Sequence, residues 1–386
     1  MSEIAIVSLA YNRTDSLKRQ LASLEQAYYT EDVDLCISID KSDTDTVELL
    51  ADRYEWKHGH KRVLKHSHRM GTRNHVISLG ELFNDYAALI VLEDDTTVAP
   101  SFYLFSKTCI EKYNDEDSIA GISLYSFNIN YQNDLPFSPV RSQWDVYLMN
   151  CAQSWGQVWM RKSWLEFKKW YDTHSGSFNI DSLPSCLNEW PDKSWLKFHT
   201  RYCIESNKYF VYPYCSLSTN NADPGVNQKA TDSLYQTEML WGRKDSYQLP
   251  SPDECDIKYD GFFNPKFLAV HLGTDDGQLT TDLYGTVPLK YSRRYLLSTR
   301  PLPYKVIRQF SLELHPMEAN VMLGRKGSGI WLYDTSTTAK APDDYNGYSL
   351  FYHYYKKAIF KSRTMIGMKG IASLVMRTII NKITEK

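Results

Sequence analysis

The sequence predicts an α/β fold in which a mostly parallel sheet is flanked by helices and followed by a basic, partly helical C-terminal extension. Two observations lead to this prediction. In the first 125 residues, short β-branched apolar runs alternate with longer segments that carry a helical apolar stripe, and such alternation is typical of a parallel sheet. The charge then changes, because 17 of the 44 Lys and Arg but only 6 of the 46 Asp and Glu lie from residue 286 onward.

Five strands are expected in the first part of the chain. They share a short apolar core, β-branched side chains and polar flanks. They are Ile4–Ala10, Leu35–Asp40, Arg62–Lys65, Ala87–Leu92 and Ile119–Ser123. The clearest helix between them is Ser16–Tyr28, with Asp15 as its expected N-cap, and another helix is expected to begin near Ser101.

Composition excludes several classes of protein. With 386 residues, 42% of them hydrophobic, the chain can bury a large core and is not disordered. A net charge of −2 argues against nucleic acid as a partner. The 7 cysteines form no C-x-x-C pair, which favours a reducing compartment without structural zinc. The N-terminus has no basic signal region and no apolar run reaches about 18 residues, so we expect a cytoplasmic protein that is soluble or lies on a membrane.

Polar residues follow the ends of the expected strands, where parallel sheets bind their ligands. They are Tyr11, Arg13, Asp40, His66–Asn74 and the triplet Glu93, Asp94 and Asp95. Three adjacent carboxylates are unfavourable unless a cation compensates them, and oxygen ligands suit Mg²⁺ or Mn²⁺ held against phosphates. We therefore expect a metal site here, with a solvated acidic loop as the alternative. The dinucleotide fingerprint G-x-G-x-x-G and the P-loop motif are absent from the sequence.

Six short motifs occur in a particular order along the chain. They are Ser8-Leu9-Ala10-Tyr11-Asn12-Arg13, Ser38-Ile39-Asp40, Gly71-Thr72-Arg73-Asn74, Glu93-Asp94-Asp95, Ser154-Trp155-Gly156 and Asp192-Lys193-Ser194-Trp195. Together they resemble the glycosyltransferases of the Rossmann-like GT-A fold, specifically family 2-like enzymes of bacterial polysaccharide biosynthesis and, more distantly, N-acetylglucosaminyltransferase I. The resemblance covers roughly residues 1 to 230, and it rests on the order and the spacing of the motifs together.

The resemblance implies inverting transfer of a sugar from a nucleotide diphosphate, with UDP favoured, to an acceptor hydroxyl. It implies that Asp95 is the direct ligand of Mn²⁺ or Mg²⁺, that Asp94 lies near the ribose and that Glu93 lies behind them. A divalent ion would neutralise the charge that develops on the leaving diphosphate. The other residues implied to bind the donor are Tyr11, Arg13, Asp40, Gly71, Arg73 and Asn74. Each arginine would hold phosphate with its planar donor fork, and a surface salt bridge is the alternative for each.

Inversion requires a base that takes the proton of the attacking hydroxyl. Asp192 is the candidate, because its neighbours Trp190 and Trp195 predict a partly desolvated carboxylate with a raised pKa. The competing candidates are Asp145, Asp181 and Glu189.

Two further predictions concern the acceptor and the metal. Trp155 and Gly156 are expected to contact the acceptor, because an aromatic ring stacks on sugars and a glycine lets the backbone approach a ligand. Packing in the core is the alternative for the tryptophan. Related sequences commonly carry a His where this chain has Asn227, so His271 becomes the candidate for a second metal ligand, against a satisfied core histidine.

The expected domains are a catalytic domain over 1–285, with a nucleotide-sugar half (1–125) and an acceptor half (126–285), and a basic extension over 286–386. Near 361–386 the pattern predicts an amphipathic helix with basic flanks, which suits the anionic inner face of a cell membrane. Packing on the protein or on a second subunit is the alternative. The expected partners are a nucleotide-sugar donor and a glycan or lipid-linked glycan acceptor. A nucleotidyltransferase and an inactive glycan-binding or scaffold protein remain the rival functions.

Overall fold

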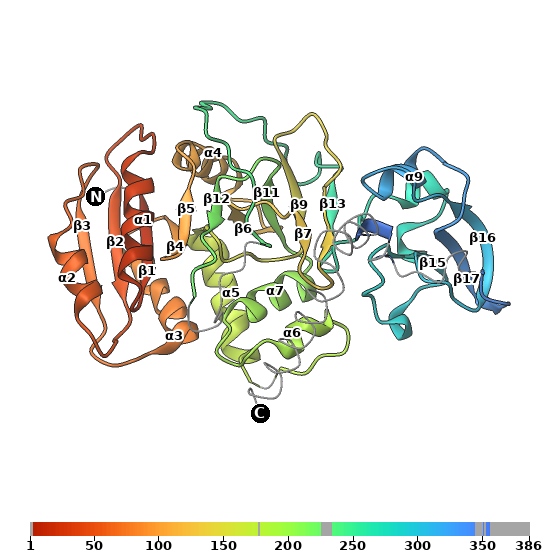
Figure 1. The fold of residues 1–386 in the computed structure, drawn as a ribbon, viewed down its shortest axis with the longest axis horizontal. Coiled ribbons are helices and arrows are strands. Elements are labelled where there is room, and N and C mark those ends of the chain that lie inside the picture. Colours follow the sequence, from red (N-terminus) through yellow and green to blue (C-terminus); the bar gives the residue numbers. More distant parts are fainter. Residues whose placement is uncertain (1–2, 177, 225–233, 344–349, 351–352, 356–386) are drawn as a thin grey trace, which may run out of the picture.

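A nine-stranded sheet forms the centre of the computed structural model, which describes residues 3–176, 178–224, 234–343, 350 and 353–355 (Figure 1). The strand order is β13-β9-β11-β6-β10-β4-β1-β2-β3. The strands are β1 (Ile4–Ala10), β2 (Asp34–Ile39), β3 (Lys61–Lys65), β4 (Ala88–Glu93), β6 (Ile119–Ser123), β9 (Val146–Met149), β10 (Gln157–Met160), β11 (Tyr209–Pro213) and β13 (Lys258–Tyr259). Only β9, β10 and β13 run against the other strands of this sheet. The predicted mostly parallel α/β sheet is therefore confirmed.

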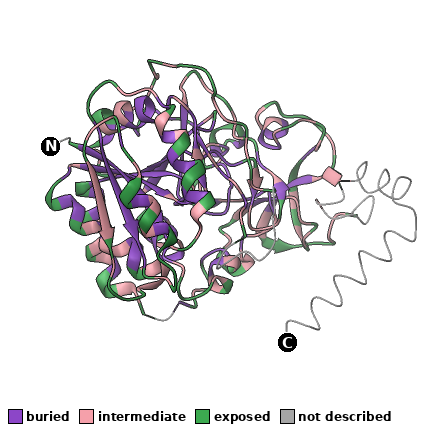
Figure 2. Ribbon diagram, turned by 60° about the vertical axis from the view of Figure 1, so that its left-hand side comes forward, coloured by how far each residue is buried: buried purple, intermediate pink, exposed green. Residues whose placement is uncertain are grey.

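The strand predictions agree with the structure to within one residue at each end. Their side chains alternate between two buried clusters, one on each face of the sheet. In β1, for example, Ile4 and Ile6 belong to one cluster, whereas Ala5 and Val7 belong to the other. Burial on both faces explains why these strands read as continuous apolar runs in the sequence. Figure 2 shows the central strands buried between helices whose outer sides are exposed.

Helices cover both faces of the sheet. Those packed on one face are α1 (Thr14–Glu25), α2 (Thr46–Arg53) and α4 (Phe102–Tyr113). Those on the other face are α3 (Gly71–Ser78), the 3-10 helix η1 (Leu79–Asn84), α5 (Arg161–His174), α6 (Ser185–Glu189) and α7 (Leu196–Glu205). The predicted N-cap of the first helix is wrong: the cap position is Arg13, and Asp15 lies inside the first turn, where the helix dipole also favours an acid.

A second sheet forms the C-terminal region at the right of Figure 1. Its order is β14-β15-β17-β16, with β14 (Leu279–Asp282), β15 (Tyr295–Ser298), β17 (Ile330–Thr338) and β16 (Tyr304–Phe310). Strand β14 precedes the predicted boundary at residue 285 and pairs with β15, so this sheet takes residues from both sides of that boundary. Between residues 295 and 338 the extension contains three strands and one short helix, α9 (Glu318–Met322). The helix predicted near 361–386 lies outside the described residues.

Short elements complete the chain. They are β5 (Thr96–Val98), which pairs with β12 (Ser218–Asn220), β7 (Ile129–Asn130), which pairs with β8 (Leu135–Pro136), the helix α8 (Ala269–Leu272), and the 3-10 helices η2 (Asp276–Gln278) and η3 (Leu289–Tyr291). Among the described residues, no helix is both long enough and apolar enough to cross a membrane.

Candidate active site

The acidic triplet emerges at the carboxyl end of β4, in the middle of the large sheet. Strand β4 lies between β1 and β10, and its residues up to Leu92 are buried. Because β1 runs parallel to β4 with Leu9 opposite Glu93, the loop after β1 lies beside the acidic turn. Strand β10 runs antiparallel to β4, so the loop that precedes Gln157 approaches the same edge from the other side.

Arg13, from the loop after β1, holds two acids of the triplet. One terminal nitrogen of its guanidinium binds the Asp94 carboxylate, and Nη1 donates to Asp95 Oδ2 at 2.9 Å. The Arg13 side chain is only 23% exposed. Its burial alone would lower the pKa of Arg13, but the charges of Asp94 and Asp95 outweigh this effect and raise that pKa. The loop after β1 and the acidic motif therefore lie together, because the Arg13 guanidinium joins the Asp94 and Asp95 carboxylates.

Asp94 and Glu93 are held in a poorly solvated environment. Burial raises the pKa of Asp94 to about 6, although the Arg13 charge acts in the opposite direction. Burial, together with the charge of Asp95, raises the pKa of Glu93 to about 8. The side chain of Trp195 lies beside Glu93 and acts to lower the pKa of this carboxyl. One arginine thus faces three acids of the same turn.

The oxygen atoms around this turn fit a divalent metal ion. Asp95 Oδ1 is buried and has no hydrogen-bond partner among the described residues. In the same part of the described chain, Thr96 Oγ1 and Asn220 Oδ1 are also buried without a partner, and these residues are opposite each other on β5 and β12. Buried polar atoms without partners are rare, and oxygen is the donor that Mg²⁺ and Mn²⁺ prefer. A cluster of three His, Cys, Asp or Glu side chains arranged for a metal is not found among the described residues.

The segment after β12 supports the acidic turn, and sequence reasoning did not assign it a role. Asn221 donates its backbone N–H and its side-chain amide to the carbonyl oxygen of Asp95, at 2.7 and 2.9 Å. The Asp223 carboxylate accepts bonds from Ser16 and Arg19 of α1. The only signal in the sequence was the polar stretch from Asn220 to Asn227. Asn227 itself lies outside the described residues.

Asp40, Gly71 and Asn74 shape the start of α3. Asp40 is buried at the end of β2, and its two carboxylate oxygens accept the backbone N–H groups of Met70 and Gly71 at 2.7 and 2.9 Å. Gly71 has a φ of 74°, in the left-handed region that favours glycine. Asn74 donates to the carbonyl oxygen of Met70 at 3.1 Å. These residues build one turn beside the site, and their contacts with a donor remain predictions.

Arg73 is held by groups of the protein, and its contact with a phosphate stays a prediction. Its guanidinium donates to the Tyr171 hydroxyl at 2.5 Å and to the carbonyl oxygens of Ser175 and Asp192 at 2.7 and 3.3 Å. It also lies 4.2 Å from the centre of the Phe198 ring. Arg73 therefore ties α3 to α5 and to the loop before α7, and each of its three nitrogens donates to a group of the protein.

Tyr11 lies beside a different arginine. The guanidinium of Arg69 is 5.0 Å from the centre of the Tyr11 ring, a distance that permits a cation–π contact. Arg69 is exposed, and it belongs to the polar segment that follows β3. Sequence reasoning selected this segment but singled out Arg73 within it, because spacing alone does not show which arginine packs against the protein.

Asp192 is accessible but is not desolvated, which contradicts the predicted environment of this carboxylate. Its side chain is 95% exposed, and Oδ1 accepts a bond at 3.1 Å from the buried ammonium of Lys197. Trp195 turns into the core toward Glu93, whereas Asp192 faces solvent. The competing acids are placed as follows: Asp145 pairs with Lys244, Asp181 pairs with Lys290, and Glu189 is exposed.

The loop with Trp155 and Gly156 lies next to the acidic turn, as the pairing of β10 with β4 requires. Gly156 has a φ of 91°, and a Cβ atom there would lie 2.9 Å from Ser218 Oγ, so a larger residue does not fit. The Trp155 ring is partly exposed and packs edge to face on Tyr125, with the ring centres 4.9 Å apart. Contact of this loop with an acceptor stays a prediction.

His271 is an exposed residue of α8, which packs against α9 of the C-terminal region. The core-histidine alternative is therefore wrong. Within the described ranges His271 makes no hydrogen bond or ion pair to the acidic turn, and its role as a metal ligand stays a prediction.

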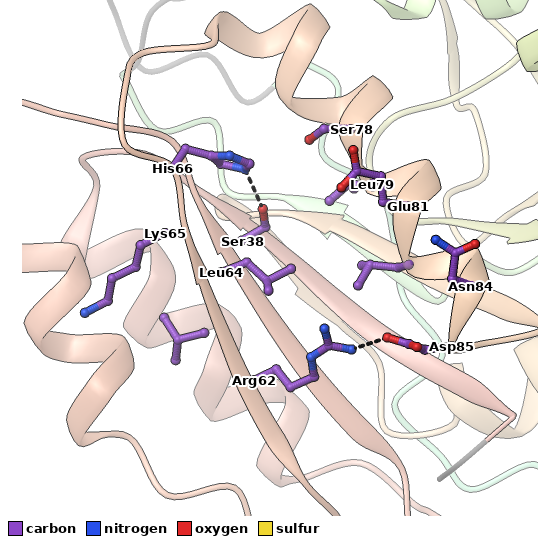
Figure 3. Close-up of a pocket in the computed structure, with 12 residues that line it drawn as sticks. Ser38, Arg62, Leu64, Lys65, His66, Ser78, Leu79, Glu81, Asn84 and Asp85 are labelled. Atoms are coloured by element: carbon purple, nitrogen blue, oxygen red, sulfur yellow. Dashed lines mark hydrogen bonds and ion pairs between the residues drawn. The ribbon is translucent and has the colours of Figure 1, made fainter.

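A separate cavity of about 520 Å³ lies between the edge strand β3 and η1 (Figure 3). An ion pair between Arg62 and Asp85 lies at one end, and His66 approaches Ser38 Oγ at the other. Its lining includes neither Arg13 nor the acidic turn. Burial, together with the nearby His66, lowers the pKa of His75 to about 4, and the neutral imidazole bonds to Ser38 Oγ at 2.7 Å.

No protein-family model and no curated protein matches this chain. Among solved structures it is similar to TarS 1–349 of S. aureus in complex with UDP-GlcNAc (10% identity, TM-score 0.39, 58% of this chain and 60% of that chain). It is also similar to the mannosyltransferase PcManGT from Pyrobaculum calidifontis in complex with GDP-Man and Mn²⁺ (10%, 0.35, 55% and 54%). A third is GalNAc-T7 with UDP, GalNAc and Mn²⁺ (14%, 0.38, 57% and 44%). The chain spans about half the length of the structures it matches, and likenesses at these low TM-scores assign no function to it.

Proposed function

We propose that this chain is a GT-A-type glycosyltransferase that uses a divalent metal ion, Mn²⁺ or Mg²⁺, to transfer a sugar from a UDP-sugar to a hydroxyl of a glycan acceptor with inversion. One observation carries the proposal. The buried oxygen Oδ1 of Asp95 is without a partner among the described residues, at the carboxyl end of a central strand and beside the guanidinium of Arg13. This is where a parallel sheet binds its ligands, and a metal–diphosphate complex would satisfy both the acid and the arginine.

The residues around the turn have distinct roles in this proposal. Asp95 holds the metal ion, and Arg13 binds the diphosphate. Glu93 lies behind them at the end of β4, where burial raises the pKa of its carboxyl, and Asn221 keeps the turn in place through the Asp95 carbonyl. A divalent ion bound here supplies positive charge to the leaving diphosphate. Trp155 and Gly156 border the acceptor side, because their loop lies at the same sheet edge.

Asp192 remains the proposed base. The loop that carries it reaches the site through Trp195, whose side chain lies beside Glu93. The Asp192 carboxylate is exposed, so an acceptor hydroxyl can reach it, and its Oδ1 accepts a bond from the Lys197 ammonium. Binding of an acceptor would supply the desolvation that the structure lacks at this carboxylate. The physiological acceptor that we propose is a bacterial surface polysaccharide or its lipid-linked precursor.

The test is a thermal-unfolding panel of UDP, GDP, CMP and dTDP, each with and without Mn²⁺. Wild type would be compared with Asp95→Asn and with Asp85→Asn, a matched Asp-to-Asn change outside the site. At a ligand concentration 100 times Kd, binding to the folded state alone stabilises it by about 2.7 kcal/mol. We expect UDP to raise the unfolding temperature only when Mn²⁺ is present, in wild type and Asp85→Asn but not in Asp95→Asn. If no nucleotide shifts wild type under either condition, the chain is not an active transferase and the scaffold reading is the better one.

A further inference from the structure

The Arg13 guanidinium forms ion pairs with Asp94 and Asp95, the carboxylates that a metal ion would need. We infer that Arg13 is an exchangeable counter-ion: it neutralises Asp94 and Asp95 while the site is empty, and it leaves these carboxylates for the diphosphate when a metal–nucleotide complex binds. The inference rests on the proposed function, because it concerns the order in which that site is filled.

The first step in the reasoning is electrostatic. Arg13 uses two different nitrogens for the two acids, and it occupies Oδ2 of Asp95, while Oδ1 has no partner among the described residues. A divalent ion bound at Oδ1 would share this carboxylate with the guanidinium. Two cations so close together repel each other, strongly so where the surroundings exclude water. The metal ion alone should therefore bind weakly to this site, since Arg13 opposes it.

The second step is that Arg13 is able to move. Among the described residues, its contact with a further acceptor is long, 3.5 Å to the carbonyl oxygen of Asp223, and its side chain is partly exposed. Arg73, in contrast, is held by three acceptors and an aromatic ring. Leaving the acidic turn would break two ion pairs of Arg13, and a diphosphate would replace both with a bidentate contact.

The third step concerns where the diphosphate would lie. Arg13 is the N-cap residue of α1, a helix of 12 residues, and its side chain makes no capping bond to any described residue. The first N–H groups of such a helix attract anions. A phosphate near this end of α1 would meet both the helix terminus and the released guanidinium. Nucleotide and metal ion should then increase each other's affinity by the same factor.

The experiment measures Mn²⁺ binding directly, from the electron paramagnetic resonance signal of free Mn²⁺, without and with saturating UDP. The proteins are wild type, Arg13→Gln, Arg13→Lys and, as a control, Arg62→Gln. The control removes an arginine of the edge strand β3 that pairs with Asp85, outside the site. We expect Arg13→Gln to bind Mn²⁺ alone about tenfold more tightly than wild type, and UDP to increase this affinity less than it does in wild type. Arg62→Gln should behave like wild type.

Arg13→Lys keeps the positive charge but cannot bind both carboxylates with a planar fork, so its affinity for Mn²⁺ alone should lie between those of wild type and Arg13→Gln. If Arg13→Gln does not fold, the affinity of Arg13→Lys for Mn²⁺ alone is compared with that of wild type instead. Equal or weaker binding of Mn²⁺ alone by both variants, while wild type binds Mn²⁺ with UDP, overturns the exchange and leaves the proposed function intact. Absence of Mn²⁺ binding by wild type even with UDP overturns both.

Discussion

Two arginine–aspartate pairs in this molecule look alike but differ in how completely the acid is satisfied. In the C-terminal sheet, Asp282 is fully buried and accepts bonds from Ser298 Oγ, from the backbone N–H of Val287 and from Arg300. At the edge of the large sheet, Arg13 serves Asp94 and Asp95 together, and one oxygen of Asp95 has no partner among the described residues.

The difference distinguishes a structural pair from a binding site. One acid surrounded by three donors needs nothing from outside, so the Asp282 pair joins β14 to the strand beside it. Three acids that face one arginine have excess negative charge and an unused oxygen, which a cation from solution can satisfy. Burial alone does not separate the two cases, because Asp94 and Asp282 are both buried.

The largest expected effect comes from Asp95→Asn. The change keeps the shape of the side chain but removes the charge that would hold the metal ion, so sugar transfer should fall at least about a thousandfold, equivalent to about 4 kcal/mol. The free energy of unfolding should change by less than about 1 kcal/mol, because the lost pair with Arg13 is offset by weaker repulsion within the triplet. UDP release and urea unfolding would measure the two effects. Full activity of the variant would contradict the site.

Asp282→Asn should show the reverse behaviour. Breaking a buried pair leaves Arg300 uncompensated, so the free energy of unfolding should fall by about 3 kcal/mol, while the folded fraction keeps its transfer rate. Urea unfolding measures the loss. The control is Asp343→Asn, in an exposed pair with Lys340, which should change stability by less than about 0.5 kcal/mol. Equal losses of unfolding free energy in Asp282→Asn and Asp343→Asn would mean that the buried pair stabilises the fold no more than the exposed pair does.

Glu318 is a third kind of buried acid, with one oxygen bonded by the Tyr259 hydroxyl at 3.0 Å and the other without a partner among the described residues. Burial raises the pKa of Glu318 to about 7, although the bonds it accepts act in the opposite direction. The unfolded value is about 4.3. Since the folded chain binds the extra proton between these values, the free energy of unfolding should fall by up to about 1.4 kcal/mol per unit as pH rises through this window.

The Glu318→Gln variant should lack this contribution while keeping a similar shape. Urea unfolding between about pH 5 and 8 would measure this. As pH rises to about 7, the free energy of unfolding should fall in wild type relative to the variant. A difference that does not depend on pH would show that Glu318 ionises normally in the folded chain.

The smallest effect is expected from Asn221→Ala. The variant loses the amide bond to the Asp95 carbonyl but keeps the bond from its own backbone N–H, so stability should fall by about 1 kcal/mol. The affinity for Mn²⁺ with UDP should fall about tenfold if this bond positions the turn. Asn114→Ala, which removes an amide that contacts exposed Asp115, is the control. Unchanged Mn²⁺ affinity in Asn221→Ala would assign the bond a purely structural role.

Local pattern was enough to predict the sheet and the position of the acidic turn. The strands are continuous apolar runs because both faces of the sheet are buried, and this property is visible in consecutive residues. For the same reason, Glu93, Asp94 and Asp95 could be placed at a strand end, beside the loop that carries Arg13. Residue type then indicated a metal ion, because clustered carboxylates need a cation.

Which polar group meets which partner was decided only by the tertiary structure. Arg13 and Asp95 are 82 positions apart, and Asn221 and Asp95 are 126 apart. Arg73 is bound by protein acceptors, Asp192 faces solvent, and neither result is visible in the motif that contains the residue. The physical reason is that side-chain direction and solvation depend on the elements packed around a residue, and these come from distant parts of the chain, whereas strand and helix periodicity depends on neighbours in sequence.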